Sequence, residues 1–358
     1  MSLLDKLKKV GAADVKGEII TNSSFFNSRQ ICKTDLPILN VAFTGDIDGG
    51  MPTGLTIVAG ASKTFKSAIS LYCMKAYLEE HKDGVAIFYD TEGGITPDYL
   101  KSFKIDTDRV LHIPVDHIEQ LKFDMMKKLD EIKKGDKVFF LVDSIGQISS
   151  KKEVEDATDE KSVADMTRAK ALRSLLRLCT MQFMKKELPC IMINHVYANI
   201  GGTGHSVTVG GGSSVVYSAN TVWIIGKSQE KDGTELTGWN FNINIEKSRY
   251  IREKSRLSIQ VLYDSGIQKY SGMLDLALES GHIAKPSMGW YQLVDADTGE
   301  MVGGKVRAAN ADPLIEEVIK REKFKQWVKD KFKPHGAIND QEDTIEEIED
   351  AYLTESDD

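Results

Sequence analysis

The sequence predicts an α/β fold built on a mostly parallel sheet with helices on both faces. Short apolar runs rich in β-branched and aromatic residues alternate with helical patterns along most of the chain. Several runs, such as residues 138–142, are apolar at every position, which is typical of parallel strands buried on both faces. One such run, residues 55–60, leads directly into a Gly-x5-Lys-Ser loop and then a helical stretch, as phosphate-binding loops do.

The predicted parallel strands are residues 55–60, 85–90, 110–115, 137–143, 190–196 and 221–227. One intervening helix has clear ends, because Asp116 can cap it, Glu119 completes a capping box and Gly135 stops it. Its buried face is expected to carry Leu121, Met125, Leu129 and Ile132. Residues 241–246 and 256–264 alternate with period two, which predicts antiparallel strands that extend the sheet.

Three regions flank this core. Residues 1–35 hold an amphipathic helix and a polar stretch with Phe25 and Phe26, and we expect an N-terminal arm. The core then spans 36–271. Residues 272–339 are predicted to form a small C-terminal domain, with a helix at 273–280, an extended piece around 289–291 and a helix at 313–332. Residues 340–358 are predicted to be an acidic, disordered tail.

Composition excludes some classes of protein and leaves others open. The 358 residues include 46 basic and 54 acidic side chains, for a net charge of -8. Ten acids and no Lys or Arg fall in residues 340–358, so the remainder carries -8 + 10 = +2 and nucleic-acid binding is not excluded. This tail either keeps the protein soluble or competes with an anionic ligand. No apolar run approaches the ~20 residues of a membrane span, and no secretory signal is expected. The four cysteines are scattered and predict neither disulfides nor a zinc site.

The phosphate-binding loop is Gly60-Ala61-Ser62-Lys63-Thr64-Phe65-Lys66-Ser67. In such a loop, backbone N–H groups at a helix N-terminus surround the β-phosphate, Lys66 reaches the β- and γ-oxygens, and the Ser67 hydroxyl binds magnesium. Phe65 stands where this motif usually has a second glycine. If that position requires a positive φ, a Phe there costs roughly 1–2 kcal/mol, which predicts a reshaped loop.

Polar residues also follow three other predicted strands. Asp143 ends a strand where a carboxylate can orient magnesium and its waters, and Glu92 follows another strand where it can polarise a water. His195 follows a third strand, just before a glycine-rich stretch. Each also has an ordinary structural interpretation, as a solvated turn acid or a buried histidine. Because open α/β sheets bind ligands at the carboxyl ends of their strands, their joint occurrence predicts a nucleotide site.

Several stretches together resemble one family, the RecA-type recombinases, and most closely the UvsX recombinases of tailed bacteriophages. They are GDIDGGMPTGLTIVAGASKTFKS (45–67), FYDTEGGITPDYL (88–100), FLVDSIG (140–146), INHVYA (193–198), IEKSRYIREKS (245–255) and YSGMLDLALESG (270–281). The resemblance implies a RecA-type P-loop ATPase core that uses ATP and Mg²⁺. The UvsX branch carries the same loop with Phe, so Phe65 is consistent with ATP binding.

The resemblance implies a role for each matching residue. Glu92 resembles the general base and Asp143 the magnesium-orienting acid, while Tyr99 falls where adenine stacks, with Thr96 nearby. His195 occupies the position of the γ-phosphate sensor. Lys247 and Arg249 match cations that reach the neighbouring subunit's ATP site, where they would act as arginine fingers do. Without the resemblance, Lys247 and Arg249 would be interpreted as ordinary solvated charges on a strand.

The resemblance also implies two DNA-binding loops, at about 149–164 and 198–215. The first opens with Lys151 and Lys152 and precedes a basic helix that carries Arg168, Lys170, Arg173 and Arg177. The second contains Gly210, Gly211 and Gly212 and is expected to be a mobile loop. Lysine, arginine and glycine-loop N–H groups bind phosphates without sequence preference. Phe25 and Phe26 would anchor the arm either in a neighbouring subunit or on their own core.

The function that the resemblance implies is ATP-dependent homologous recombination. The protein is expected to form a helical filament on single-stranded DNA, to pair it with double-stranded DNA and to exchange strands in the cytoplasm of an infected bacterium. A phage single-stranded-DNA-binding protein and a recombination mediator are the expected protein partners. Two alternatives remain open at this point: a hexameric helicase with the same core, and a non-catalytic paralogue that acts as a mediator.

Overall fold

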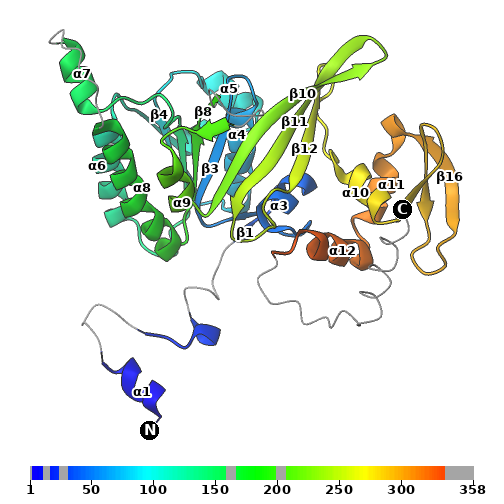
Figure 1. The fold of residues 1–358 in the computed structure, drawn as a ribbon, viewed down its shortest axis with the longest axis horizontal. Helices are drawn as coiled ribbons and strands as arrows, with labels where there is room; N and C mark the ends of the chain where they lie inside the picture. Colours follow the sequence, from blue (N-terminus) through cyan, green and yellow to red (C-terminus); the bar gives the residue numbers. More distant parts are fainter. Residues whose placement is uncertain (1, 11–16, 24–30, 159–166, 199–206, 335–358) are drawn as a thin grey trace, which may run out of the picture.

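The fold is taken from a computed structural model, which describes residues 2–10, 17–23, 31–158, 167–198 and 207–334. Its centre is a nine-stranded sheet in the order β13-β12-β11-β10-β3-β7-β6-β4-β5 (Figure 1). The strands of its parallel part are β3 (Gly54–Gly60), β4 (Val85–Asp90), β5 (Val110–Pro114), β6 (Val138–Asp143), β7 (Pro189–Asn194) and β10 (Thr221–Asp232). The predicted α/β class with a mostly parallel sheet is therefore confirmed.

The sheet is buried on both faces, because neighbouring residues of its central strands point into different apolar clusters. In β6, Phe139 and Leu141 belong to one cluster, whereas Phe140 and Val142 belong to the other. The first cluster is completed mainly by α3 (Pro37–Thr44) and α4 (Lys66–Glu80). The second is completed by α6 (Ile118–Glu131) and α8 (Thr167–Lys186), which lie side by side (Figure 1). Continuous apolar runs in the sequence reflect this double coverage.

The start of α6 differs from the prediction. His117, rather than Asp116, is the N-cap residue, since its Nδ1 accepts a 3.2 Å hydrogen bond from the Gln120 backbone N–H. The Gln120 side chain reaches back to accept from the Asp116 N–H at 2.8 Å, so Glu119 does not complete the box. The predicted apolar face is otherwise correct for Leu121, Met125 and Leu129, all fully buried.

The antiparallel part of the sheet is longer than the sequence pattern indicates. Strand β10 continues to Asp232 and pairs with β11 (Glu235–Ser248) in a long hairpin. Strands β12 (Arg256–Leu262) and β13 (Gly266–Ile267) complete this side. The outer half of β10 lacks an apolar pattern and is largely exposed, whereas the facing half of β11 is mostly half-buried.

The C-terminal segment contains α10 (Met273–Glu279) and a small antiparallel sheet of β14 (Ile283–Ser287), β15 (Trp290–Val294) and β16 (Met301–Arg307). The single helix predicted at 313–332 is wrong, because α11 (Asp312–Val318) and α12 (Glu322–Phe332) are separate. Arg321, between them, has extended backbone and donates to the Val294 carbonyl at 2.6 Å. This turn directs Phe324 into the apolar cluster shared with the core.

Helix α12 packs against the core (Figure 1). The Phe332 carbonyl accepts from the Arg252 N–H at 2.8 Å. Two ion pairs join the helix to the loop after α3, at 2.9 Å between Lys325 and Asp48 and 3.1 Å between Lys329 and Asp46. The C-terminal segment is therefore attached to the core through its last helix. The domain boundaries given from the sequence stay predictions.

The remaining elements are short. They are α1 (Leu3–Lys8), η1 (Ile20–Asn22), β1 (Ile31–Cys32), β2 (Met51–Pro52), α5 (Pro97–Ser102), η2 (Thr107–Arg109), α7 (Lys151–Thr158), β8 (Val196–Ala198), β9 (Val207–Val209), α9 (Ser213–Ser218) and η3 (Ala308–Asn310). Helix α1 lies apart from the core with its leucines exposed (Figure 1). Phe25, Phe26 and the acidic tail lie outside the described residues.

Within the described parts of the chain, no helix has the length and apolar character to span a membrane.

Candidate functional site

The loop between β3 and α4 has the form that a phosphate requires. A side chain at Gly60 would meet Thr64 Oγ1 at 2.6 Å and the Ile225 carbonyl at 2.7 Å, so only glycine fits at the start of the loop. Lys66 is the first residue of α4, and its Nζ donates to the Ala61 carbonyl at 2.7 Å. Burial lowers the pKa of this amine. A phosphate oxygen could take the place of the Ala61 carbonyl as the acceptor of the Lys66 Nζ hydrogen bond. The Lys66 amine is therefore already placed at the helix N-terminus where a phosphate would bind.

Phe65 occupies the left-handed region at φ 68° and ψ 14°, the conformation for which the usual glycine is suited. The loop thus keeps this conformation despite the larger residue. The Phe65 ring stacks on Phe241 of β11, with ring centroids 4.6 Å apart and planes at 12°. A stacked pair contributes about 0.5–1.5 kcal/mol, which offsets much of the roughly 1–2 kcal/mol that the left-handed conformation costs.

Ser67 and Asp143 meet at the predicted edge of the sheet. The Ser67 hydroxyl donates to Asp143 Oδ2 at 2.6 Å, and both carboxylate and hydroxyl line a hollow beside the loop. Burial raises the pKa of Asp143 to about 6, although the hydrogen bond from Ser67 opposes this shift. A carboxylate and a hydroxyl fit Mg²⁺, which prefers oxygen ligands and is held through few protein groups together with phosphates.

Residues that follow two other strands contact the Glu92 carboxylate. The Ser144 hydroxyl donates to Glu92 Oε1 at 2.5 Å, and His195 Nε2 lies 3.3 Å from the same oxygen. Asp90 fixes the turn, because its Oδ1 accepts from the N–H groups of Glu92 at 3.0 Å and Gly93 at 2.7 Å. The carboxylate is thus oriented from both the side chain and the backbone.

Sequence reasoning missed Ser144 and Asp90. Asp90 pairs with Asp143 in the parallel register of β4 and β6, so both acids lie at the same level of the sheet. Ser144 directly follows Asp143. A search for polar residues one position either side of each strand end would have found them, since all such positions meet at this edge.

Tyr99 borders the loop from the other side. Two hollows, of about 270 and 340 Å³, share Ser67 and Tyr99 among their lining residues. Tyr99 lies on α5, whose N-cap Thr96 accepts from the Tyr99 N–H at 3.2 Å. Its side chain is 40% exposed and is therefore available to a ligand ring. Phe241 lines the larger hollow and was also missed, because no local pattern relates it to the loop.

Comparisons with known proteins agree with this geometry. A family model described as the RecA N-terminal domain matches residues 26–268. The chain belongs to the RecA family. A second model, described as the C-terminal domain of the bacteriophage T4 recombination and repair protein, matches residues 270–328.

Individual RecA-family relatives give the same result. The chain is 43% identical over 353 residues to the "Recombination and repair protein" of Enterobacteria phage T4, covering 97% of this chain and 90% of that one. It is 26% identical to "Protein RecA" of Mycobacteroides abscessus, over 82% of both chains. It is 24% identical to "Protein RecA" of Acinetobacter baylyi, over 83% of this chain and 85% of the relative. ATP use is implied for this chain by membership of the RecA family.

The residues expected to serve a neighbouring RecA-family subunit lie away from their own nucleotide loop. Lys247 lies on β11, two strands away from β3 in the sheet. Through Val222 of β10 it is level with Ile57 of β3, which is three residues before Gly60. This places it about 10 Å across and about 10 Å along the sheet from the loop. Arg249 follows the end of β11 and lies farther along the same direction.

Lys247 also contacts α9. Its Nζ donates to the carbonyls of Val216 and Tyr217 at 2.9 Å each. Burial lowers the pKa of this amine, and Arg249 adds to the effect. The structure therefore does not bring Lys247 to its own Glu92.

The structure describes only part of the second predicted DNA loop of this RecA-family chain. Within 198–215, the described residues form β9, which pairs with β8, and the start of α9. Gly210 is buried, and its N–H donates to the His195 carbonyl at 2.9 Å. Its carbonyl accepts from Asn194 Nδ2 at 2.8 Å. Gly211 and Gly212 have φ of 81° and 71°, in the left-handed region that favours glycine, and both are half-buried.

The first predicted DNA segment is a helix where the structure describes it. Lys151 and Lys152 begin α7 and are exposed, and Lys151 pairs with Glu155 at 3.4 Å. Residues 159–166 lie outside the described ranges. Lys170 and Arg177 are exposed on α8, as a phosphate-binding face requires.

Arg168 behaves differently from the other cations of α8. Its guanidinium donates to the carbonyls of Ile148 at 2.9 Å, Gly146 at 2.5 Å and Ile145 at 3.3 Å. These bonds support the chain between β6 and α7, so Arg168 has a structural role that the sequence pattern did not indicate.

Proposed function

We propose that this RecA-family protein is an ATP-dependent homologous recombinase. It assembles as a helical filament on single-stranded DNA, pairs that strand with homologous double-stranded DNA and exchanges strands. The proposal includes roles in phage recombination, recombination-dependent replication and repair within the infected cell. The expected protein partners are a single-stranded-DNA-binding protein and a recombination mediator. The identity of 43% with a phage recombination and repair protein supports this assignment.

The observation that carries the proposal is the position of Glu92. Its carboxylate is held by Ser144 and His195 and lines the same hollow as Ser67 and Asp143. In the proposed reaction, Lys66 binds the β- and γ-phosphate oxygens, and Glu92 accepts a proton from the attacking water. Ser67 and Asp143 would hold Mg²⁺, which supplies charge neutralisation at the phosphates.

The link from nucleotide to DNA runs through His195. Its imidazole contacts Glu92, while its backbone carbonyl and the adjacent Asn194 side chain hold Gly210. A γ-phosphate that changed the imidazole contact would therefore act on the start of the glycine segment. In this proposal, that is how ATP orders the DNA-binding loop.

The C-terminal end of β11 serves the neighbouring subunit in this proposal. Lys247 and Arg249 are too distant from their own loop, so in a filament they would contact the γ-phosphate held by the next protomer. Lys247 would first release the Val216 and Tyr217 carbonyls of α9. Because α9 follows the glycine segment directly, subunit contact and DNA contact would be coupled.

The test combines electron microscopy with two assays. With single-stranded DNA and a non-hydrolysable ATP analogue, we expect helical filaments. With ATP in place of the analogue, we expect DNA-stimulated hydrolysis and strand exchange. Lys66→Ala should abolish hydrolysis and strand exchange, whereas Lys82→Gln, a change of an exposed lysine after α4, should not. Rings that displace strands without pairing them would instead indicate a helicase. Absence of DNA-dependent hydrolysis would indicate a non-catalytic mediator, and full strand exchange by Lys66→Ala would refute the site assignment.

A further inference from the structure

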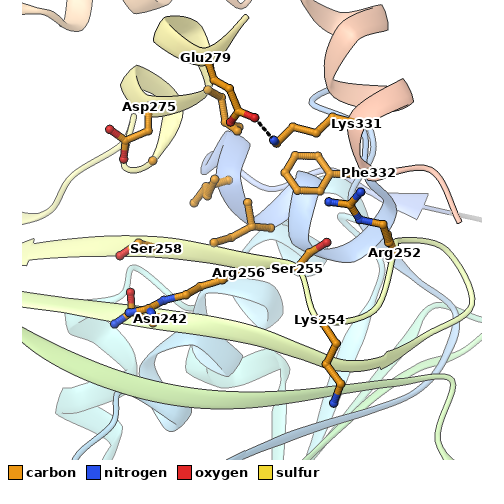
Figure 2. Close-up of a pocket in the computed structure, with 14 residues that line it drawn as sticks. Asn242, Arg252, Lys254, Ser255, Arg256, Ser258, Asp275, Glu279, Lys331 and Phe332 are labelled. Carbon is orange, nitrogen blue, oxygen red and sulfur yellow. Dashed lines mark hydrogen bonds and ion pairs between the residues drawn. The ribbon is translucent and has the colours of Figure 1, made fainter. Parts of the chain in front are cut away.

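A hollow of about 460 Å³ lies between the core and the C-terminal helices, away from the nucleotide loop. Figure 2 shows it bounded by the connection from β11 to β12 on one side and by α10 and α12 on the other. It shares no lining residue with the two hollows at Ser67. Its floor is buried and includes Leu257 and Phe332. This size is typical of small-ligand pockets.

Ser255 contributes an unpartnered hydroxyl to this hollow. The residue is only 6% exposed, and its Oγ has no hydrogen-bond partner among the described residues. Its backbone is fixed, because the Ser255 carbonyl accepts from the Ile245 N–H at 2.9 Å. A buried hydroxyl without a partner is costly, and a ligand oxygen in the hollow would supply the missing bond.

The charges around the hollow are mostly positive. The lining cations are Arg252, Lys254, Arg256 and Lys331, and the lining acids are Asp275 and Glu279. Lys331 already pairs with Glu279, as the dashed line in Figure 2 marks. Lys254 likewise pairs with Glu246 at 2.8 Å, outside the hollow.

Two arginines retain unused charge. Neither Arg252 nor Arg256 forms an ion pair with any residue in the described ranges. In Figure 2 the Arg252 guanidinium lies close to Phe332 on the same side as the Ser255 hydroxyl, whereas Asp275 lies on the far side. An anion at the Arg252 end would thus meet a guanidinium and a hydroxyl, would be separated from Asp275, and would face Glu279 only as the partner of Lys331.

We propose that this hollow is a binding site for a phosphate group, with the Arg252 guanidinium and the Ser255 hydroxyl as its donors. Guanidinium and hydroxyl donors suit phosphate oxygens, and the volume admits more than one phosphate. The group could belong to a free polyphosphate or to the backbone of a DNA strand. Because the Arg252 N–H binds the Phe332 carbonyl at 2.8 Å, occupancy would fasten α12 to the core.

The site can be tested by calorimetric titration of the full chain with sodium pyrophosphate. Lys66→Ala is used as the background, so that the nucleotide loop contributes little. We expect Arg252→Gln to weaken binding about tenfold or more, and Ser255→Ala about three- to tenfold. The matched control Lys82→Gln, which removes a charge remote from the hollow, should change the affinity less than twofold.

Ser255→Ala also separates ligand binding from a structural role. Removing an unpartnered buried hydroxyl should leave the Tm unchanged or raise it without ligand, while the rise in Tm on adding pyrophosphate becomes smaller. A hydroxyl with a structural partner would give the opposite result, a lower Tm with the pyrophosphate response intact, and that outcome would overturn the proposal.

The source of the phosphate is identified with a second probe, a tetrathymidylate. If Arg252→Gln weakens pyrophosphate binding alone, the site takes a free phosphate. If it weakens only the oligonucleotide, the site takes the DNA backbone. Equal affinities of the parent and Arg252→Gln for both probes would refute the site without affecting the proposed recombinase function, which depends on Lys66 and Glu92.

Discussion

The rings of Phe65 and Phe241 lie nearly parallel at a centroid distance of 4.6 Å and join the nucleotide loop to strand β11. Phe65 is held in a left-handed conformation, and β11 also carries Lys247, which is proposed to act at the neighbouring subunit. The stack thus stabilises a conformation that glycine would adopt without support.

Replacement of Phe241 should therefore affect nucleotide binding through Phe65. We expect Phe241→Leu to weaken ADP binding several-fold, because the loop loses its stacking partner while the core keeps most of its volume. In a Phe65→Gly background the same change should have little effect. A double-mutant cycle measured by nucleotide titration should give a coupling of about 0.5–1.5 kcal/mol, and additive effects would contradict this role.

Asp143 should destabilise the nucleotide-free protein above pH 6. Its folded pKa of about 6 lies above the ordinary value of 3.8, so the folded state binds the extra proton and stability falls as pH rises through this range. Asp143→Asn should raise the free energy of unfolding by at most about 3 kcal/mol at pH 7.5. The gain should shrink by about 1.4 kcal/mol for each pH unit below 6, as urea unfolding at several pH values would show. A gain that is constant from pH 5 to 8 would contradict this explanation.

Two inactive variants should restore each other's activity. If Lys247 acts at the site of the next subunit, an interface is complete when one protomer supplies Lys66 and its neighbour supplies Lys247. Equal mixtures of Lys66→Ala and Lys247→Ala should then recover about a quarter of the DNA-stimulated ATPase, because random mixing gives that share of intact interfaces. Each variant alone should be inactive. No recovery in mixtures shown to co-assemble would place both residues in one protomer.

The cations of α8 should separate into two groups. Arg168→Gln should lower the free energy of unfolding by about 1–3 kcal/mol, since it leaves three carbonyls after β6 without their donor. Lys170→Gln and Arg177→Gln, on exposed positions of the same helix, should leave stability within about 0.5 kcal/mol. They should instead reduce the salt dependence of DNA binding. Equal loss of stability in all three variants would refute this division.

Removal of Asp340–Asp358 should strengthen DNA binding. The truncation changes the net charge from -8 to +2 and so removes the segment proposed to compete with DNA phosphates. Binding measured across a salt series should show a higher affinity or a lower magnesium requirement. If the affinity is unchanged at every salt concentration, the tail is only a solubilising end.

Much of the fold and part of the candidate site could be predicted because they depend on local patterns. Continuous apolar runs identify strands buried on both faces, and parallel strands bring their ends to one edge, so Lys66, Asp143, Glu92 and His195 could be placed together. Helix ends were less predictable. His117 is the N-cap of α6 in place of the predicted Asp116, because either side chain can accept a hydrogen bond from a free N–H group of the first turn.

The sequence by itself determined the α/β class, the phosphate-binding loop and the set of polar strand ends, since these follow from residue periodicity and spacing. Only the tertiary structure decided that Phe241 supports Phe65, that Ser144 orients Glu92, that Arg168 faces inward and that α12 packs against the core. These contacts join residues far apart in the chain. They depend on strand register and on the packing of whole elements, which no short sequence pattern encodes.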